Sequence, residues 1–397
     1  MEQFKEAASI IKTLKKNGYE AYFVGGSVRD YLIGRPIGDI DIATSALPQD
    51  VMRLFPRHVP VGLEHGTVIV LHKEIPYEVT TFRIESGYED FRRPSAVTFV
   101  RLLKEDLQRR DFTMNAIAMT EQGEIVDPFA GREAIFKRQI ETVGNPHERF
   151  QEDALRMMRG IRFVSTLGFT LTPLTKQAIA DHVALLDHIA IERIAAEFEK
   201  LLTGQYVTQA LCLLAETRLC EHLPHFEQKR EALVQAAQYD WTEIKTHIEA
   251  WVFLLYIMQE PSPEEVLKSW KLPNKTIKSI VQVLKFLYKR TGNNWDGMLL
   301  YEAKEDAAVM AETLYCVLSR TKAAPAVEKV RTAYWNLPIH DRKELQVAGK
   351  DLLQWSSKQA GPWVAEVLRG IERAVVCGQL ENSKERIKEW LNRCSLL

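Results

Sequence analysis

The spacing of apolar residues changes near His147, and this change divides the chain into two kinds of structure. Before about residue 140, short runs rich in β-branched and aromatic residues alternate with helical stretches and are separated by Gly, Pro and Asp. After His147, apolar residues recur at helical spacing. The sequence therefore predicts an α+β N-terminal region, with one small mixed sheet and helices packed against it, followed by an all-α region.

Individual elements can be placed within these two regions. Short strands are expected at six positions, namely Ala21–Val24, 39–43, 67–71, 77–82, 96–100 and 124–126. Helices are expected between them, at 27–32, 49–55 and 113–119. The all-α region is expected to begin with three helices, at 148–167, 174–186 and Ile191–Leu202. Further breaks are expected near residues 261–263 and 322–325, where prolines interrupt the pattern.

The charge balance excludes a globally basic nucleic-acid-binding protein. The 397 residues carry a formal net charge of -1. Contact with RNA would therefore depend on local arginine clusters. Three such clusters are present: Arg92-Arg93, Arg109-Arg110 and Arg156/Arg159/Arg162.

Cysteine and tryptophan usage narrows the class of protein further. None of the five cysteines forms a CxxC pair, which argues against a zinc knuckle or a disulfide framework and fits a reducing cytoplasm. The N-terminus does not resemble a signal peptide, and no apolar run approaches the roughly 20 residues that span a bilayer. We therefore expect a cytoplasmic protein without membrane contact. All eight tryptophans follow residue 240 and are expected to lie in helical cores.

Asp39 and Asp41 are the first candidates for chemistry. They are two residues apart in an expected strand, so both carboxylates would point to one face while Ile40 and Ile42 point into the core. Two close carboxylates repel each other and gain from a shared cation, and Mg²⁺ is the expected ion where triphosphate oxygens lie nearby. Taken alone, the pair is also compatible with a solvated strand end or a turn.

A glycine turn precedes this pair. The expected strand ends at Val24, Gly25 and Gly26 make a turn, and Ser27 is expected to cap a helix that begins at Val28. Glycines let backbone N–H groups approach a phosphate, and a helix N-terminus adds a positive dipole end. Arg29, in the first turn of that helix, is expected to reach a phosphate. The turn and the aspartate pair together indicate a nucleotidyltransferase.

These segments, GGSVRD followed by GDIDIAT, resemble the nucleotidyltransferase signature of the DNA polymerase β superfamily. The likeness is to the class II tRNA CCA-adding enzymes and their relatives, the bacterial poly(A) polymerases. It implies a polymerase β-like catalytic domain followed by helical neck, body and tail domains. The corresponding boundaries are 1–140 for the catalytic head, 141–202 for the neck, 203–270 for the body and 271–397 for a tRNA-binding tail.

Two later motifs extend the resemblance. Residues 109–116 match the family's RRDxTxNA element, in which Arg110 is a fixed forked cation for triphosphate or a ribose hydroxyl. Asp111 is expected either to orient Arg110 or to accept from the ribose 2′-hydroxyl, and Asn115 to donate to a phosphate from the following helix. Residues 127–131 match a DPxxG element, to which we assign a structural hinge role.

The EDxxR element at 152–156 predicts how the base is chosen. Asp153 and Arg156 are three residues apart, so on one helix they would be neighbours. Cytosine and adenine each present an amino donor beside a ring-nitrogen acceptor, which suits an aspartate acceptor beside an arginine donor. Uracil and guanine present a carbonyl and an N–H there, so a buried charged group would face a like partner. In the resembled family this pair selects CTP and ATP. Arg159 and Arg162 are expected to bind nucleotide or the RNA 3′ end.

Four further features have weaker signals. Residues 84–95 lack periodicity and are expected to form a mobile loop, whose presence in the resembled family accompanies full CCA addition. Glu78 is either a third active-site carboxylate or an exposed strand residue. Residues 191–194 resemble the family's last motif and are expected to support the base-selecting helix. His340-Asp341 has no recognisable metal partners and is taken as a loop dipeptide.

The sequence thus predicts template-independent addition of CCA to the 3′ end of tRNA from CTP and ATP, with Mg²⁺ on Asp39 and Asp41. Gly26, Arg29, Arg110, Asp153, Arg156, Arg159 and Arg162 are the expected nucleotide-binding residues. The alternatives are a poly(A) polymerase, which tends to carry a longer basic C-terminal extension not expected here, and a CC-only or A-only tRNA enzyme. A non-catalytic RNA-binding protein and a small-molecule nucleotidyltransferase fit less of the pattern. A homodimer stays open.

Overall fold

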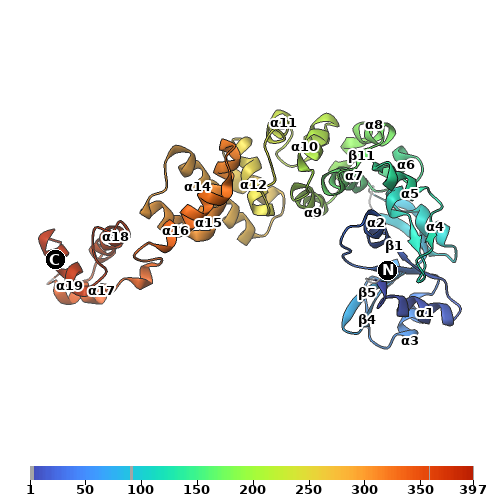
Figure 1. Cartoon of the computed structure of the whole chain (residues 1–397), viewed down its shortest axis with the longest axis horizontal. Helices are drawn as coiled ribbons and strands as arrows, with labels where there is room; N and C mark the ends of the chain where they lie inside the picture. Colours follow the sequence, from blue (N-terminus) through green and yellow to red (C-terminus); the bar gives the residue numbers. More distant parts are fainter. Residues whose placement is uncertain (1–3, 90–92, 357, 397) are drawn as a thin grey trace. The chain divides into compact units, whose positions relative to one another are not determined.

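The computed structural model describes residues 4–89, 93–356 and 358–396, and it separates into two compact units, Met1–Ala237 and Gln238–Leu397 (Figure 1). The first unit has a mixed sheet followed by helices, and the second consists of helices. The predicted α+β region followed by an all-α region is therefore confirmed. The finer division into four parts stays a prediction.

The first unit is built on a seven-stranded sheet with the order β3-β4-β5-β2-β1-β8-β9. Its strands are β1 (Ala21–Val24), β2 (Asp41–Thr44), β3 (His58–Pro60), β4 (Thr67–His72), β5 (Ile75–Thr81), β8 (Ala118–Met119) and β9 (Ile125–Val126). Strands β2 and β5 are parallel, and the other neighbours are antiparallel. Val24 and Ala43 belong to one buried apolar cluster, and Phe23, Ile42 and Val79 belong to another, in which they pack against the first helices. Those helices are α1 (Ala8–Lys16), α2 (Gly26–Ile33) and α3 (Pro48–Leu54).

Two expectations for this unit are wrong. Residues 113–119 do not form a helix, because only a short 3₁₀ turn, η3 (Thr113–Asn115), precedes β8, whose two residues pair with β1. The expected loop at 84–95 is largely a hairpin, since β6 (Arg83–Glu89) and β7 (Arg93–Phe99) pair antiparallel. Residues 90–92, between these two strands in the sequence, lie outside the described residues, and with them Arg92 of the Arg92-Arg93 cluster.

The rest of the first unit connects the sheet to a helical layer. Its elements are α4 (Leu103–Gln108), α5 (Gly131–Phe136), β10 (Gln139–Ile140), α6 (Pro146–Glu152), α7 (Leu155–Leu167), β11 (Thr170–Leu171), α8 (Pro173–His182), η4 (Val183–His188), α9 (Ile191–Leu202), α10 (Val207–Glu216), η5 (Leu219–His222) and α11 (Arg230–Ala236). The Asp127 carboxylate accepts hydrogen bonds from the Gly131 and Arg132 amides at 2.7 and 2.8 Å, so it caps α5.

The predicted single helix at 148–167 is wrong, because Asp153 has extended backbone angles (φ −138°, ψ 103°).

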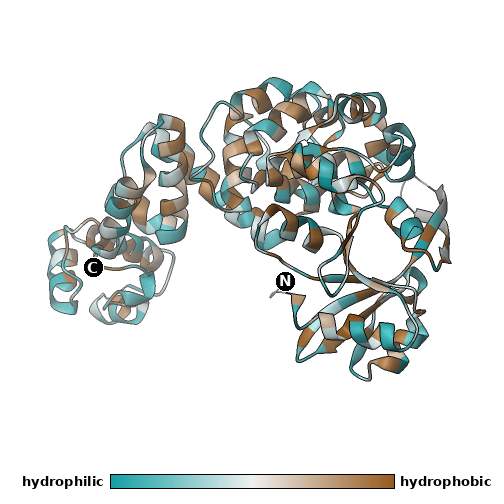
Figure 2. Cartoon of the chain, turned by 45° about the vertical axis from the view of Figure 1, so that its right-hand side comes forward, coloured by the Kyte–Doolittle hydropathy of each residue, from teal (hydrophilic) through white to brown (hydrophobic). Residues whose placement is uncertain are grey.

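The second unit consists of helices whose apolar faces turn inward (Figure 2). They are α12 (His247–Ile257), α13 (Pro263–Ser269), α14 (Asn274–Gly292), α15 (Gly297–Ser319), α16 (Ala323–Trp335), η6 (Arg342–Glu344), α17 (Gly349–Trp355), α18 (Trp363–Val376) and α19 (Lys384–Arg393). Residues 258–262 separate α12 from α13 and residues 320–322 separate α15 from α16, close to the predicted breaks, but the chain divides into its two compact units between Ala237 and Gln238. Trp251 and Trp270 are fully buried with ring centroids 5.0 Å apart, whereas Trp335 is 61% exposed and is not a core residue. None of the helices in the described residues is long and apolar enough to span a membrane.

Candidate active site

The glycine turn, Asp41 and Arg110 converge at one point. Strand β1 ends at Val24, Gly25 has φ 72° and ψ −139°, and α2 begins at Gly26. A Cβ atom on Gly25 would lie 3.1 Å from Arg110 Nη1 and 3.4 Å from Asp41 Oδ2. The expected cap is wrong in detail: Ser27 lies inside the first turn of α2 and donates to the Val24 carbonyl at 3.0 Å. The turn nevertheless brings bare backbone next to a carboxylate and a guanidinium.

Asp41 lies among other carboxylates. It is the first residue of β2 and is paired with Val24 on one side and Glu78 on the other. Burial and the negative charges of Glu78 and Asp39 raise the pKa of Asp41 to about 6, against the opposing effect of Arg110. Asp39 is exposed and precedes the strand, so the strand expected at 39–43 begins two residues late. Glu78 is thus an exposed strand residue whose charge also acts on Asp41.

The donor set around Asp41 fits a divalent cation that is also bound by phosphate. A carboxylate that neighbouring acids make hard to ionise gains stability from a metal ion. Among the described residues, no group of three or more His, Cys, Asp or Glu is arranged to hold an ion alone. The two aspartates would therefore need oxygen ligands from a substrate or from water, as Mg²⁺ commonly has.

A cavity of about 470 Å³ opens beside this point. Its wall includes Gly26, Arg29, Asp41, Arg110, Asp153, Arg156, Arg159 and Arg162, which are all the predicted site residues except Asp39. Gly25 and Phe163 also line it, together with Asp111 and Asn115, for which the sequence predicts roles, and three polar residues without a predicted role in the site: Arg83, Glu85 and Arg109. The predicted residues, far apart in the sequence, thus share one cavity.

Asp111 organises one wall of the cavity. Its carboxylate accepts from Arg159 Nε and Nη2 at 2.8 and 2.6 Å, from Asn115 Nδ2 at 3.0 Å and from the Phe112 amide at 2.8 Å. Burial acts to raise the pKa of Asp111, but Arg159 and these donors hold it well below its ordinary value. Asn115 Oδ1 in turn accepts from Arg29 Nη1 at 2.7 Å. The prediction that Asp111 orients Arg110 is wrong, because Asp111 binds Arg159.

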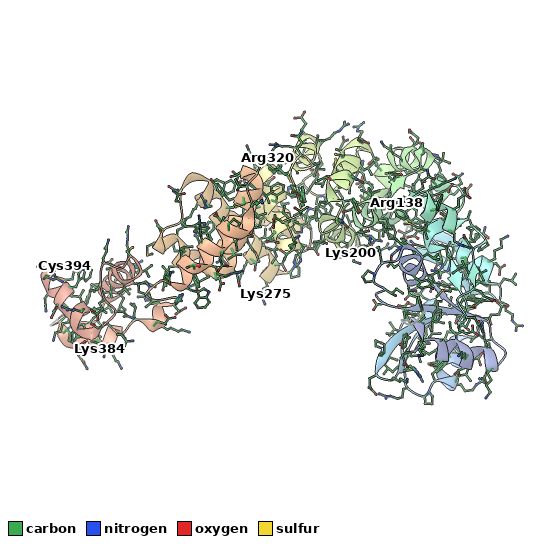
Figure 3. The ribbon with its side chains drawn as sticks, viewed as in Figure 1. Arg138, Lys200, Lys275, Arg320, Lys384 and Cys394 are labelled. Atoms are coloured by element: carbon green, nitrogen blue, oxygen red, sulfur yellow. The ribbon has the colours of Figure 1, made fainter. Side chains whose placement is uncertain are left out.

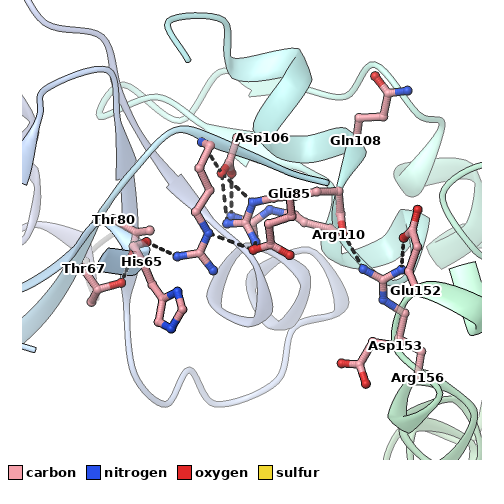
Figure 4. A network of polar contacts seen from close by, with 12 residues as sticks. His65, Thr67, Thr80, Glu85, Asp106, Gln108, Arg110, Glu152, Asp153 and Arg156 are labelled. Carbon is pink, nitrogen blue, oxygen red and sulfur yellow. Dashed lines mark hydrogen bonds and ion pairs between the residues drawn. The ribbon is translucent and has the colours of Figure 1, made fainter. Parts of the chain in front are cut away.

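Arg110 is instead positioned by Asp106, which is only 1% exposed. Asp106 Oδ2 accepts from Arg110 Nη2 at 3.1 Å, and Asp106 Oδ1 accepts from Arg109 Nε at 3.0 Å. Glu85 of the β6–β7 hairpin accepts from Arg109 Nη1 at 3.1 Å and from Arg83 Nε at 2.9 Å (Figure 4). The hairpin is therefore linked by ion pairs to the segment that carries Arg110.

Asp153 and Arg156 do not lie on one helix, so the predicted geometry of this pair is wrong. The chain breaks at Asp153, and Arg156 lies in the first turn of α7. Asp153 Oδ2 accepts from Arg193 Nη2 of α9 at 3.0 Å. Arg156 Nη1 donates to Glu152 Oε2 at 2.6 Å, and its Nη2 donates to the Arg109 carbonyl at 2.9 Å. Both side chains still line the cavity, but different partners hold them.

Helix α9 supports the remaining arginines. Glu197, which is 7% exposed, lies 2.5 Å from Arg162 Nε and 3.5 Å from Arg159 Nη1. The Arg162 guanidinium lies 3.8 Å from the centroid of the Phe163 ring. Residues 191–194 are predicted as support from the sequence, but Glu197 is not. The available signal was its position one helical turn after Arg193, on the same face of α9.

Comparison with known proteins identifies the family. The family model described as the poly A polymerase head domain matches residues 21–141, and the tRNA nucleotidyltransferase domain 2 model matches residues 242–391. A third model, described as a probable RNA and SrmB-binding site of polymerase A, matches residues 168–229. The CCA-adding enzymes of Bacillus cereus (strain AH820) and Bacillus anthracis are each 61% identical over 397 residues, covering 100% of both chains. The chain belongs to the CCA-adding enzyme family.

Solved structures of this family agree with the fold. The crystal structure of the Bacillus stearothermophilus CCA-adding enzyme in complex with CTP has a TM-score of 0.94 and 49% identity, and the match covers 100% of this chain and 98% of that one. The Thermotoga maritima CCA-adding enzyme complexed with tRNA shares the fold at 21% identity, with a TM-score of 0.63. The predicted class, a template-independent tRNA nucleotidyltransferase, is confirmed.

Proposed function

We propose that this CCA-adding enzyme family member adds C, C and A in turn to the 3′ end of tRNA, using CTP and ATP and releasing pyrophosphate. One observation carries the proposal: Arg110 Nη1 and Asp41 Oδ2 both lie within 3.4 Å of the position that a Cβ atom on Gly25 would occupy. This arrangement provides backbone N–H groups, a forked cation and a carboxylate where a nucleoside triphosphate would meet a metal ion.

Each candidate residue has its own proposed role. Asp39 and Asp41 would hold Mg²⁺, which when bound neutralises phosphate charge and makes the terminal RNA hydroxyl a better nucleophile. The amides at the start of α2, with Arg110, would hold the triphosphate in line with that hydroxyl. Arg29 is already bound to Asp30 and Asn115, so it would act mainly by fixing Asn115 and Asp111.

Base selection is proposed to rest on Asp153 and Arg156. An aspartate acceptor and an arginine donor complement the Watson–Crick edges of cytosine and adenine, and each is held by a separate partner, Arg193 and Glu152. A mismatched base would leave one of these groups unpaired in a partly buried site, at a cost of about 1–3 kcal/mol. Arg159 and Arg162, which line the cavity, would contribute positive charge toward the bound nucleotide.

The wider proposals follow from the same assignment. The family acts on tRNA, so we propose a cytoplasmic location for this chain. We also propose the four-part division into head, neck, body and tail at residues 140, 202 and 270. A homodimer is left as an alternative to the monomer.

The decisive test supplies tRNA ending at the discriminator base with CTP alone, ATP alone, and both. We expect two C residues with CTP alone and CCA with both nucleotides, as resolved on a sequencing gel. The head of the chain also matches a poly A polymerase model, so the competing result is long A tails on tRNA and on unrelated RNA. That result, or a product that stops at CC with both nucleotides, would overturn the proposal.

A further inference from the structure

Helix α15 is interrupted in its interior at Lys304. The helix spans Gly297–Ser319, but Lys304 has φ 64° and ψ 166°, a backbone region that essentially only glycine adopts. At its C-terminal end the helix stops at Arg320 (Figure 3), whose angles of φ 55° and ψ 41° are the ordinary left-handed ones. Lys304 carries a Cβ atom, so contacts from the rest of the fold must maintain its conformation.

The sequence around Lys304 favours a continuous helix instead. Residues 299–311 read LLYEAKEDAAVMA and consist mostly of strong helix formers, namely Leu, Glu, Ala, Lys and Met. The helix contains no proline, and its only glycine is Gly297, its first residue. Proline and glycine, two usual causes of a sharp kink, are therefore absent near Lys304. Such disagreement between local preference and fold is expected at functional or strained sites.

The two parts of α15 on either side of Lys304 join different groups of helices. Before the break, Tyr301 packs into a cluster of buried residues from α17, α18 and α19, which we call the C-terminal core. Its other members include Val347, Leu352, Ile371, Val375, Ile387 and Leu391. After the break, Glu312 accepts from Arg290 Nε of α14 at 2.6 Å. Lys304 therefore lies where the helix passes from one group of helices to the other.

The Lys304 side chain binds the second connection between these groups. The chain returns to the C-terminal core through residues 336–348, which join α16 to α17. In that segment the His340 carbonyl accepts a hydrogen bond from Lys304 Nζ. The ammonium group also lies 4.3 Å from the centroid of the Tyr301 ring, and Tyr301 donates to Glu372 Oε1 of α18 at 2.6 Å. The residue with the strained backbone thus also joins the two connections through its side chain.

The groups around the break have partners of their own. A break in a helix leaves backbone groups without their helical partners. The Ala303 carbonyl accepts from Gln282 Nε2 of α14 at 3.2 Å. His340 is held in turn, because its Nε2 lies 3.0 Å from the Tyr334 carbonyl and its amide donates to Glu344 Oε2 at 3.0 Å. The kinked conformation is therefore supported from α14, from α16 and from the segment that follows α16.

We propose that Lys304 is a positioning residue with two competing conformations, one kinked and bound to His340, the other continuing α15 as an unbroken helix. The proposal rests on the proposed function, since the C-terminal core belongs to the predicted tRNA-binding tail. Straightening α15 would swing that core relative to α14 and α16. Backbone strain persists only where the surrounding structure maintains it, which assigns the kinked conformation as the one that binds tRNA. The bond to His340 therefore acts on tRNA affinity and not on the reacting atoms.

Two substitutions at Lys304 separate the strain from the bond to His340. Lys304→Ala removes the bond and keeps the strain of a Cβ atom, whereas Lys304→Gly removes both. The alanine variant should shift toward the unbroken helix, and KM for tRNA in CTP incorporation should rise about 5- to 10-fold, the inverse of the kinked fraction that remains. The glycine variant should stay kinked and keep KM for tRNA within about twofold of the wild type. In both variants kcat and KM for CTP should stay unchanged, because the catalytic cavity is intact.

Asp306 provides the matched control. It is exposed and lies two residues further along α15 with helical backbone angles. Glycine there should be less stable than alanine, as in any helix interior. At Lys304 the order should reverse, so Lys304→Gly should melt at a higher temperature than Lys304→Ala. If thermal melts show alanine to be the more stable residue at both positions, Lys304 is not strained and the proposal is wrong.

A distance measurement tests the two conformations without tRNA or CTP. Spin labels are placed on Cys394 at the end of α19 (Figure 3) and on α16 through Lys329→Cys, with the accessible Cys212 and Cys377 replaced by serine. Pulsed electron spin resonance should give one main distance in the otherwise unchanged chain and in Lys304→Gly, and a second distance in Lys304→Ala. The same distance distribution in all three would overturn the proposal. If the distances differ as expected but the wild type does not incorporate CTP, the two conformations of α15 are supported and the proposed function is refuted.

Discussion

Replacing Gly25 by alanine tests the geometry on which the active-site assignment depends. At φ 72° and ψ −139°, Gly25 occupies a region that only glycine adopts without strain, and the strain costs about 1–3 kcal/mol for another residue. The new methyl group would also lie 3.1 Å from Arg110 Nη1 and 3.4 Å from Asp41 Oδ2. Arg110 would have to move away from the position where the triphosphate is proposed to bind.

The expected result is a large loss of activity with a modest loss of stability. A displacement of about 1 Å in a reacting group lowers the rate by about 100-fold, so single-turnover CTP incorporation by Gly25→Ala should fall at least that far. The melting temperature should fall by an amount equivalent to about 1–3 kcal/mol. Measuring both on the same preparation separates misplacement from unfolding.

Gly34→Ala is the matched control. Gly34 ends α2 with φ 77°, and a Cβ atom there would meet nothing within 4 Å. Its alanine variant should lose about 1 kcal/mol of stability from the left-handed backbone and keep nearly full activity. If Gly25→Ala incorporates CTP as fast as Gly34→Ala, the turn does not form part of the nucleotide site and the reasoning fails.

Three further predictions follow from the site. Asp41→Asn should abolish CTP incorporation at every Mg²⁺ concentration while leaving tRNA affinity within about twofold, and chelation of divalent ions should have the same effect on the wild type; full turnover by the variant would contradict the metal assignment. Arg193→Gln should release Asp153 and raise the incorporation of UTP relative to CTP by roughly 10-fold, or about 1.4 kcal/mol. The measurement is the ratio of kcat/KM for UTP to kcat/KM for CTP, and an unchanged ratio would show that Arg193 does not position Asp153. Burial and His147 lower the pKa of His182, so folding disfavours its protonation and stability should fall as the pH drops through the ordinary histidine range near 6.5; thermal melts between pH 8 and pH 5 should show a smaller loss in His182→Gln.

Sequence patterns located the parts of the site that depend on local chemistry. The turn at Gly25 and the strand Ala21–Val24 were predictable because glycine and β-branched residues have strong local preferences. The break at Asp153 was not, because a helical pattern continues on both sides of it. The extended backbone there is maintained by contacts from elsewhere in the fold, including the ion pair with Arg193, forty residues away in the sequence.

The partners of the arginines were hidden for a similar reason. Arg110 and Asp111 are adjacent in the sequence, which predicts that they pair, but Arg110 binds Asp106 and Asp111 binds Arg159. Asp106 and Glu197 fix the arginines, yet each looks like an ordinary acid of an amphipathic helix. Only the packing of α4 and α9 against the cavity reveals that they are buried.

The distribution of charge around the cavity explains why so many acids lie beside so many arginines. Among the described residues, seven arginines and four acids line the wall, which leaves three net positive charges. Buried arginines without partners would repel one another and move, so the acids fix their directions while reducing the excess charge. A nucleoside triphosphate carries several negative charges, and it would neutralise the remainder without displacing the acids. Asp106 does not line the wall itself but binds Arg110, which does. Removing Asp106 should therefore weaken triphosphate binding even though it makes the surroundings of the cavity more positive, because Arg110 would lose the position in which it can bind.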